Sequence, residues 1–173
     1  MRKATRNDIQ DINQLTELAK SIMASDQNPQ WDHRYPIEKD FYDDIDNGDL
    51  YLYEIDKKVV GYICINQSQA DWYKQLKWPM SLDQAYVIHR MSANPEYRGV
   101  AAKMMQFAID LANEAKATIL LTDTFSLNKR AQQLFAKFDF VKAGEYEINE
   151  FPFDKGAPFY AYYKLIDNKE KLL

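Results

Sequence analysis

The stretch from Tyr86 to Lys103 constrains the fold of this chain more than any other part of the sequence. Its apolar first half predicts a β-strand over Tyr86–Ala93, and Asn94-Pro95 ends that strand. Arg98-Gly99 then leads into an amphipathic helix that we expect to run from about Val100 to Ala115. The first turn of a helix exposes unpaired N–H groups and the positive end of the dipole, which can hold an anion such as a pyrophosphate. Many strand-to-helix connections of this kind bind nothing, so the pattern alone leaves a purely structural role open.

The remainder of the chain predicts a mixed α/β (α+β) fold in one domain over residues 1–173, because no linker or repeat divides it. Thr5-Arg6-Asn7-Asp8 predicts a helix start, and apolar residues then recur at helical spacing as far as Ile22. The segment 66–84 is predicted to be a polar, aromatic insertion. The other expected elements are helices over Ile37–Asp46 and Asn128–Phe138, and strands over Leu50–Ile55, Val59–Ile65, Thr118–Leu121, Phe140–Ile148 and Phe159–Leu165.

Composition excludes several classes of protein. A single cysteine, Cys64, rules out an internal disulfide framework and a cysteine-based zinc site, and two histidines are too few for a metal cluster, so no metal is expected. The chain has no apolar run near the roughly 20 residues that span a bilayer and no signal-peptide pattern, which predicts a cytoplasmic protein that does not enter a membrane. The net charge of −4 and the lack of an evident basic face argue against a nucleic-acid partner.

Seven aspartates gather between positions 26 and 49, and two explanations remain open. They form either a solvated helix face with its loops or a field that attracts a cationic substrate. These residues are Asp26, Asp32, Asp40, Asp43, Asp44, Asp46 and Asp49.

The run Arg98-Gly99-Val100-Ala101-Ala102-Lys103 resembles the acetyl-CoA-binding motif of the GNAT superfamily of N-acetyltransferases, whose pattern is Arg/Gln-x-x-Gly-x-Gly/Ala. Two positions depart from it, because Ala101 replaces the central glycine and Lys103 the last small residue. Ala101 adds a methyl group near the phosphates, and Lys103 would either obstruct the diphosphate or add a charge beside it.

A second run, from Asn128 to Phe140, is similar to the family's Asn-x-x-Ala-x-x-Leu-Tyr-x-Lys-x-Gly-Phe, with Asn128, Ala131, Leu134, Lys137 and Phe140 in register. Two motifs in the right order and at the right separation are more specific than either one. The resemblance extends over about residues 2–165. It includes a bacterial subgroup that carries Asn28-Pro29-Gln30-Trp31 and Val87-Ile88-His89-Arg90-Met91.

The resemblance implies a GNAT-like fold, in which a central, mostly antiparallel sheet contains a splayed strand pair and has helices on both faces. It implies transfer of an acetyl group from acetyl-CoA, without a metal, to a primary amine by direct attack. The acceptor would be a small-molecule or peptide amine. The resemblance places Met91, Ser92 and Ala93 beside the pantetheine arm. At the pyrophosphate it places Arg98, Gly99, Val100, Ala101, Ala102 and Lys103, and the N–H groups of residues 100–103 would hold that group. It also places Asn128, Arg130 and Phe135 at the cofactor. An ordinary helix N-cap is the other explanation for Asn128.

The catalytic groups depart from the family pattern at one position. The family often has a tyrosine, which protonates the departing thiolate, where this chain has Phe135, so water, Tyr86 or Tyr146 would have to replace it. His89 is our candidate base, because it shares strand parity with Met91 and Ala93 and an ordinary histidine pKa suits proton removal at neutral pH. The alternative for His89 is a histidine whose hydrogen bonds are satisfied inside the sheet.

Six aromatic residues either border an acceptor pocket or belong to the core and its rim: Trp31, Tyr35, Tyr42, Trp72, Tyr73 and Trp78. Asp123 is expected at the end of a strand, in a structural role. A non-catalytic acyl-CoA-binding module is the main alternative function, and an unrelated α/β domain with a chance motif is a third. The segment 151–158 could support a homodimer.

Overall fold

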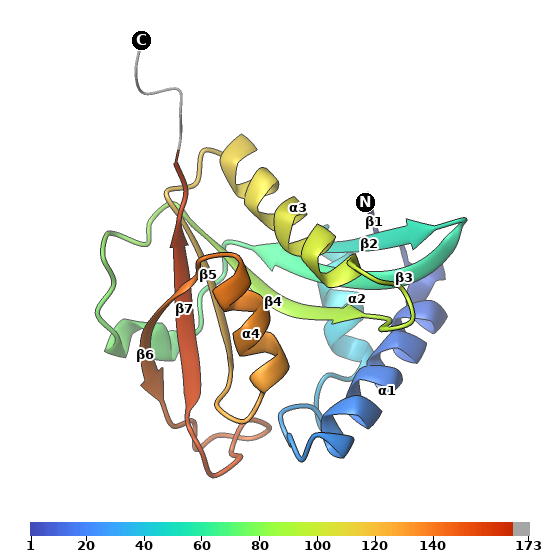
Figure 1. Cartoon of the computed structure of the whole chain (residues 1–173), viewed down its shortest axis with the longest axis horizontal. Helices are drawn as coiled ribbons and strands as arrows, with labels where there is room; N and C mark the ends of the chain where they lie inside the picture. The colour runs from blue at the N-terminus through green and yellow to red at the C-terminus, as the bar shows by residue number, and fades with distance from the viewer. Residues whose placement is uncertain (168–173) are drawn as a thin grey trace.

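A computed structural model describes residues 1–167 and contains one seven-stranded sheet (Figure 1). The strand order is β1-β2-β3-β4-β5-β7-β6, and every pair is antiparallel except β4 with β5. The strands are β1 (Arg2–Lys3), β2 (Leu50–Ile55), β3 (Lys58–Asn66), β4 (Ala85–Ala93), β5 (Ile119–Phe125), β6 (Val141–Tyr146) and β7 (Phe159–Leu165). The expected mostly antiparallel mixed sheet is therefore confirmed.

Helices cover both faces of this sheet, as expected (Figure 1). α3 (Val100–Glu114) and α4 (Lys129–Lys137) pack on one face, while α1 (Ile9–Ser25) and α2 (Glu38–Asp46) pack on the other. Short 3-10 turns occupy Arg6–Asp8 and, inside the insertion, Asp71–Gln75. Within residues 1–167, no helix has the length and apolar character that crossing a bilayer requires.

Strand β3 lies between these two helical layers and is buried on both sides. Ile63 and Ile65 contribute to the core beneath α3, whereas Tyr62 and Cys64 contribute to the core beneath α1 and α2. A strand covered on both faces carries apolar residues without alternation, which explains the run from Val59 to Ile65.

The parallel pair β4 and β5 separates before either strand ends. Their register runs from Ala85 opposite Ile119 to Ile88 opposite Thr122, and each strand then continues without the other. In Figure 1, β4 passes between α1 and α3 while β5 stays beside β7. The splayed strand pair is confirmed. The prediction for β5 was too short, because β5 continues to Phe125 along β7 and Asp123 lies within the strand, opposite Ala161.

A β-bulge interrupts β4 near the point of separation. Ile63 pairs with Met91, whereas Ile65 pairs with Ile88, so two steps along β3 correspond to three along β4. The extra residue shifts the alternation of side chains between faces. The parity argument that grouped His89 with Met91 and Ala93 was therefore wrong, since it assumed regular alternation through this bulge.

Close packing of β3 against α3 fixes where α3 begins. A Cβ built on Gly61 would come within 2.9 Å of both Val100 Cγ1 and Met104 Sδ. Val100 is the first residue of α3, and both side chains are fully buried. Only a glycine at position 61 lets the helix approach the strand this closely.

We expect Gly61→Ala to destabilise the protein by about 1–3 kcal/mol, because overpacking of a buried contact displaces side chains or backbone. Gly144→Ala is the matched control, since its Cβ would meet only Leu76 Cδ2, at 3.0 Å, which is the mobile end of a side chain. Urea unfolding of the two variants measures the difference. Equal losses of stability would contradict the tight β3–α3 contact.

Candidate functional site

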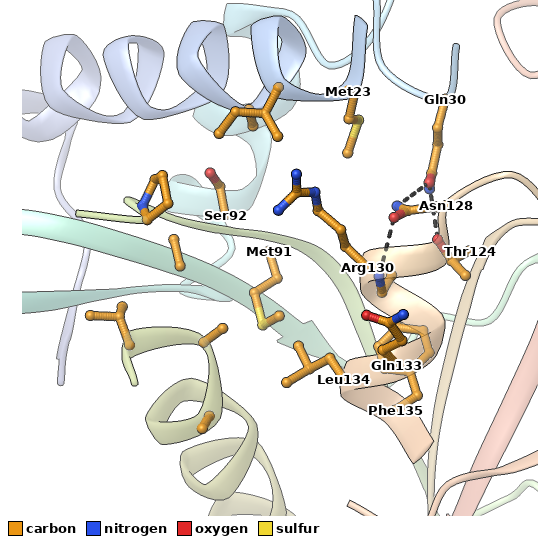
Figure 2. Close-up of a pocket in the computed structure, with 18 of the residues that line it drawn as sticks. Met23, Gln30, Met91, Ser92, Thr124, Asn128, Arg130, Gln133, Leu134 and Phe135 are labelled. Carbon is orange, nitrogen blue, oxygen red and sulfur yellow. Dashed lines mark hydrogen bonds between the residues drawn. The ribbon is translucent and has the colours of Figure 1, made fainter. Parts of the chain in front are cut away.

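A cavity of about 840 Å³ occupies the space that the separation of β4 from β5 opens. Its walls are the C-terminal half of α1, the end of β4, the first turn of α3 and one side of α4. Figure 2 shows Met91 on β4 and Leu134 on α4 directed into this space, and Phe135 on α4 also lines it. All the elements around the strand separation thus contribute side chains to one chamber.

The first turn of α3 presents unpaired N–H groups to the cavity. Gly99 takes the N-cap position with a φ of 80°, a conformation that L side chains rarely adopt. The first intrahelical bond runs from Lys103 N–H to the Gly99 carbonyl at 3.0 Å, which leaves the N–H groups of Gly99, Val100, Ala101 and Ala102 without an intrahelical partner. Of the four N–H groups predicted to hold the anion, those of Val100, Ala101 and Ala102 are therefore unpaired, whereas the N–H of Lys103 is already used.

The two departures from the family motif have different structural consequences. Ala101 lines the cavity beside Arg98 and Ala102. The side chain of Lys103 lies outside that lining, with its ammonium nitrogen 5.6 Å from the centroid of the Tyr53 ring. Lys103 consequently neither fills the cavity nor adds its charge to the N–H groups there.

The end of β4 offers a free strand edge. Met91, Ser92 and Ala93 pair with β3 on one side, and beyond Ile88 no β5 residue pairs on the other. The Ser92 hydroxyl is buried and donates to the Leu15 carbonyl at 3.3 Å. The backbone of this segment, rather than the Ser92 side chain, is what the cavity can use.

Asn128 caps α4 and also holds a network across the cavity wall (Figure 2). Its Oδ1 accepts from Ala131 N–H at 3.1 Å, which establishes the N-cap role. Its Nδ2 donates to Gln30 Oε1 at 2.7 Å, and the Thr124 hydroxyl donates to the same oxygen at 3.0 Å. One Nδ2 hydrogen remains for a ligand, so the cap and a cofactor contact are compatible. Sequence analysis missed Gln30 as a site residue, although its segment was part of the resemblance.

Arg130 reaches from α4 toward α1 (Figure 2) and pairs with Asp26 at the C-terminal end of that helix. Its Nη2 donates to Asp26 Oδ1 at 3.1 Å, and Nε donates to the other carboxylate oxygen. Both residues line the cavity, and Arg130 is largely exposed. A bound anion would therefore compete with Asp26 for this guanidinium.

Phe135 lies in the wall of the cavity and is 5% exposed. Its ring centroid is 5.2 Å from that of Tyr162 and 5.9 Å from that of Phe140. The residue therefore packs between α4 and the sheet and offers no proton.

A second cavity, also about 840 Å³, lies on the other side of the strand separation. Its walls come from the segment before α2, the 66–84 insertion and the segment that follows β6. Asp32 joins two of these walls by accepting a hydrogen bond from the ammonium group of Lys155 at 2.7 Å. The two cavities share four lining residues: Gln30, Trp31, His89 and Asp123.

The aromatic residues singled out in the sequence divide between the two possible roles. Trp31, Tyr35 and Trp72 line the second cavity, as does Tyr146. Tyr73 and Trp78 belong to the core beneath the insertion, and Tyr42 lies against the Arg6 guanidinium. Tyr86 lines neither cavity and packs on the core beneath α3. The structure therefore does not bring Tyr86 to the wall that the two cavities share, where His89 lies.

His89 lies where the two cavities meet, and its ring is hydrogen-bonded to Asn66 of the neighbouring strand β3. Its Nε2 lies 2.6 Å from Asn66 Oδ1. That amide is oriented by two further bonds, because its Nδ2 donates to Asp49 at 2.9 Å and its Oδ1 accepts from Ser68 N–H at 2.9 Å. Nε2 is thereby the donor in the neutral ring.

Burial, helped by the Arg90 guanidinium, lowers the pKa of His89 to about 4. The expectation of an ordinary pKa was wrong, and the ring is neutral at pH 7.

Asp123 is the other ionisable group at this junction. Its Oδ2 accepts a hydrogen bond from the buried Tyr73 hydroxyl at 2.6 Å. Burial raises the pKa of Asp123 to about 6, although the Tyr73 bond acts in the opposite direction. The sequence placed Asp123 at the end of a strand and predicted a structural role for it, and no local pattern marks its position at the junction.

Comparison with known proteins gives a consistent family. A family model described as the acetyltransferase (GNAT) family matches residues 12–140. An inferred acetyltransferase of Staphylococcus aureus Mu50 is 38% identical, with a TM-score of 0.75 and coverage of 95% of this chain and 97% of that one. Curated proteins yield no match.

More distant structures share the fold. A GNAT-family acetyltransferase of Streptococcus agalactiae 2603 is 24% identical with a TM-score of 0.83, and the match covers 95% of this chain and 93% of that one. An inferred acetyltransferase of Salmonella typhimurium, solved with its cofactor acetyl-CoA, is 14% identical with a TM-score of 0.67 and coverage of 96% and 92%. With the family model spanning most of the chain and a 38% identical relative along nearly its whole length, this protein belongs to the GNAT acetyltransferase family.

Proposed function

We propose that this protein is an N-acetyltransferase that moves an acetyl group from acetyl-CoA to a primary amine by direct attack. The observation that carries the proposal is the cavity between the free edge of β4 and the unpaired N–H groups of α3. Acetyl-CoA supplies an activated acetyl thioester. The amine nitrogen forms a bond to the acetyl carbon, the bond from that carbon to sulfur breaks, and the proton lost by nitrogen balances the one gained by the thiol.

The residues around the first cavity suit this cosubstrate. Four N–H groups at the start of α3, from Gly99 to Ala102, match the need of a pyrophosphate for donors. The space beside Gly99 is open, because a Cβ built there would meet no atom within 4 Å. Arg98 adds positive charge to the same chamber, and Arg130 would do so where a bound anion displaces Asp26.

The remaining family residues complete the proposed cofactor site. The backbone of Met91, Ser92 and Ala93 would pair with the amides of the pantetheine arm, as a strand edge pairs with an extended ligand. Asn128 would add its free Nδ2 hydrogen, and Phe135 would pack against the arm. An N–H of the β4 edge could also donate to the thioester oxygen and stabilise the charge that develops there.

The acceptor is proposed to enter through the second cavity and meet the thioester at the shared wall. His89 lines that wall as a neutral ring, which accepts a hydrogen bond from an amine or a water but is a poor proton acceptor. A cytoplasmic location and a homodimer stay predictions.

A non-catalytic acyl-CoA-binding module is the second candidate, and Phe135 is the observation that favours it. The residue lies at the cavity wall without a hydroxyl where the family often has a tyrosine. Titration with acetyl-CoA and with CoA, followed by an assay for amine-dependent thiol release, separates the two candidates. Binding without release under any amine would favour the module, and absence of binding would contradict both.

Ala102→Glu is expected to weaken acetyl-CoA binding by about tenfold or more, because one added charge near a phosphate costs about 1–4 kcal/mol. A carboxylate in the first turn stabilises the helix itself, so lost binding would not reflect a damaged α3. Gln106→Glu, on the exposed side of α3, is the control. Calorimetric titration measures both variants, and equal affinities would argue against a phosphate site at this turn.

His89→Ala is expected to lower kcat/KM for the acceptor and to leave acetyl-CoA affinity nearly unchanged. Because the pKa of His89 is lowered to about 4, the ring stays neutral as the pH rises above that value. The ratio of wild-type to variant kcat/KM should therefore be constant at higher pH. A ratio that changes around the ordinary pKa of 6.5 would show that the ring titrates normally.

Phe135→Tyr is expected to raise kcat by about threefold to tenfold with acetyl-CoA affinity kept. The gain stays below the usual 10²-fold minimum for general acid catalysis because a thiolate leaves readily. Steady-state thiol release measures it. An unchanged kcat in a variant that binds acetyl-CoA normally would mean that thiolate departure does not limit turnover.

A further inference from the structure

The carboxylate of Asp123 is placed where an acceptor nitrogen would have to arrive. Ile88 and Thr122 form the last β4–β5 pair, and Asp123 is the next residue along β5. It lines both cavities, and within residues 1–167 its side chain bonds only to the hydroxyl of Tyr73. A phenol is neutral, so the charge of Asp123 has no counter-charge.

The positive groups of the second cavity are neutralised. The Arg90 guanidinium donates to Asp44 through Nε at 2.9 Å and also through Nη2, and its Nη1 donates to the Tyr35 hydroxyl at 2.6 Å. His89 is neutral at pH 7. Arg90 therefore turns its charge toward α2 rather than offering it to a ligand.

The negative groups of this cavity are not neutralised in the same way. Glu147 and Glu150 line its outer wall, and in the described part of the chain neither has an ion-pair partner there. Asp71 stands at the mouth, with a side chain 98% exposed, and forms an exposed ion pair with Lys74 at 3.3 Å. Glu147, Glu150 and Asp123 therefore leave this cavity with uncompensated negative charge.

Aromatic side chains form much of the remaining wall. They are Trp31, Tyr35, Trp72, Tyr146, Phe151, Phe153 and Phe159. The rings of Trp72 and Tyr146 stack at 5.8 Å with an interplanar angle of 15°, and Tyr35 and Phe153 meet edge to face at 4.7 Å. Such walls suit an apolar body, and their faces also attract a cation.

We propose that the acceptor is a cationic amine with an apolar body and no carboxylate, and that Asp123 holds its ammonium group at the junction of the two cavities. The inference rests on the proposed function, because the amine must lie beside the thioester. An amino acid would bring a carboxylate into a cavity where the guanidinium of Arg90 is already paired with Asp44, so charge disfavours such acceptors. The raised pKa of Asp123 further suits a carboxylate that gives up its charge readily once the ammonium proton moves.

Three small probes test the class of acceptor. Benzylamine is cationic at neutral pH, aniline is neutral, and phenylglycine is benzylamine with a carboxylate on the same carbon. We expect kcat/KM to be at least about tenfold higher for benzylamine than for phenylglycine, because the carboxylate meets an anionic cavity. Equal values, or a preference for phenylglycine, would overturn the inference.

Asp123→Asn tests the residue. Asparagine keeps an acceptor for the Tyr73 hydroxyl and loses the charge, so we expect KM for benzylamine to rise by about tenfold or more and KM for aniline to stay within about threefold. Asp71→Asn removes the same charge from the exposed mouth and should change KM for benzylamine by at most about threefold, because exposed charges are screened. Equal effects of the two substitutions would mean that the overall field, and not Asp123, selects the amine.

Calorimetric titration with acetyl-CoA separates failure of this inference from failure of the proposed function. Asp123→Asn should bind acetyl-CoA as the wild type does, which also shows that the variant is folded. If the wild type binds acetyl-CoA but releases no thiol with benzylamine, the inference is overturned and the cofactor site stands. If the wild type does not bind acetyl-CoA at all, the proposed function fails first.

Discussion

The structure depends on one interruption of backbone pairing, the separation of β4 from β5 beyond Ile88 and Thr122. Each strand keeps a partner on its other side, β3 for β4 and β7 for β5, so the sheet stays continuous while its centre opens. The bulge in β4 lies at the same place and bends that strand away. A free strand edge, two cavities and their shared wall all follow from this one separation.

The two cavities differ in charge because different parts of the chain line them. The first receives the N-terminal end of α3, whose position is set by the contact of Gly61 with Val100 and Met104. Helix N–H groups make that chamber favourable to an anion. The second receives Asp123 and the acidic segment after β6, while Asp44 neutralises Arg90. An anionic cosubstrate and a cationic acceptor can thus approach one junction from opposite sides.

Much of the fold and of the cofactor site could be predicted from sequence, because the signals are local. Gly99 at a strand-to-helix connection and Asn128 at a helix start mark caps that each depend on a few neighbouring residues. The errors arose where distant segments decide the outcome. The pKa of His89 depends on burial and on Arg90, and the environment of Asp123 depends on Tyr73, fifty residues away. The N–H of Lys103 was misassigned because it bonds to the carbonyl of the N-cap residue Gly99, although the helix begins at Val100 as expected.

The amino-acid sequence by itself determined the order of helices and strands, the mixed sheet and the two motifs that resemble an acetyltransferase, since periodicity, capping and motif spacing are properties of contiguous residues. Tertiary structure alone decided which carboxylate is left without a counter-charge and which aromatic rings line a cavity. Asp44 pairs with Arg90 across forty-six residues, whereas the side chain of Asp123 bonds, among residues 1–167, only to a neutral phenol. Charge compensation between segments far apart in the chain cannot be inferred from either segment, because it depends on the three-dimensional packing that brings them together.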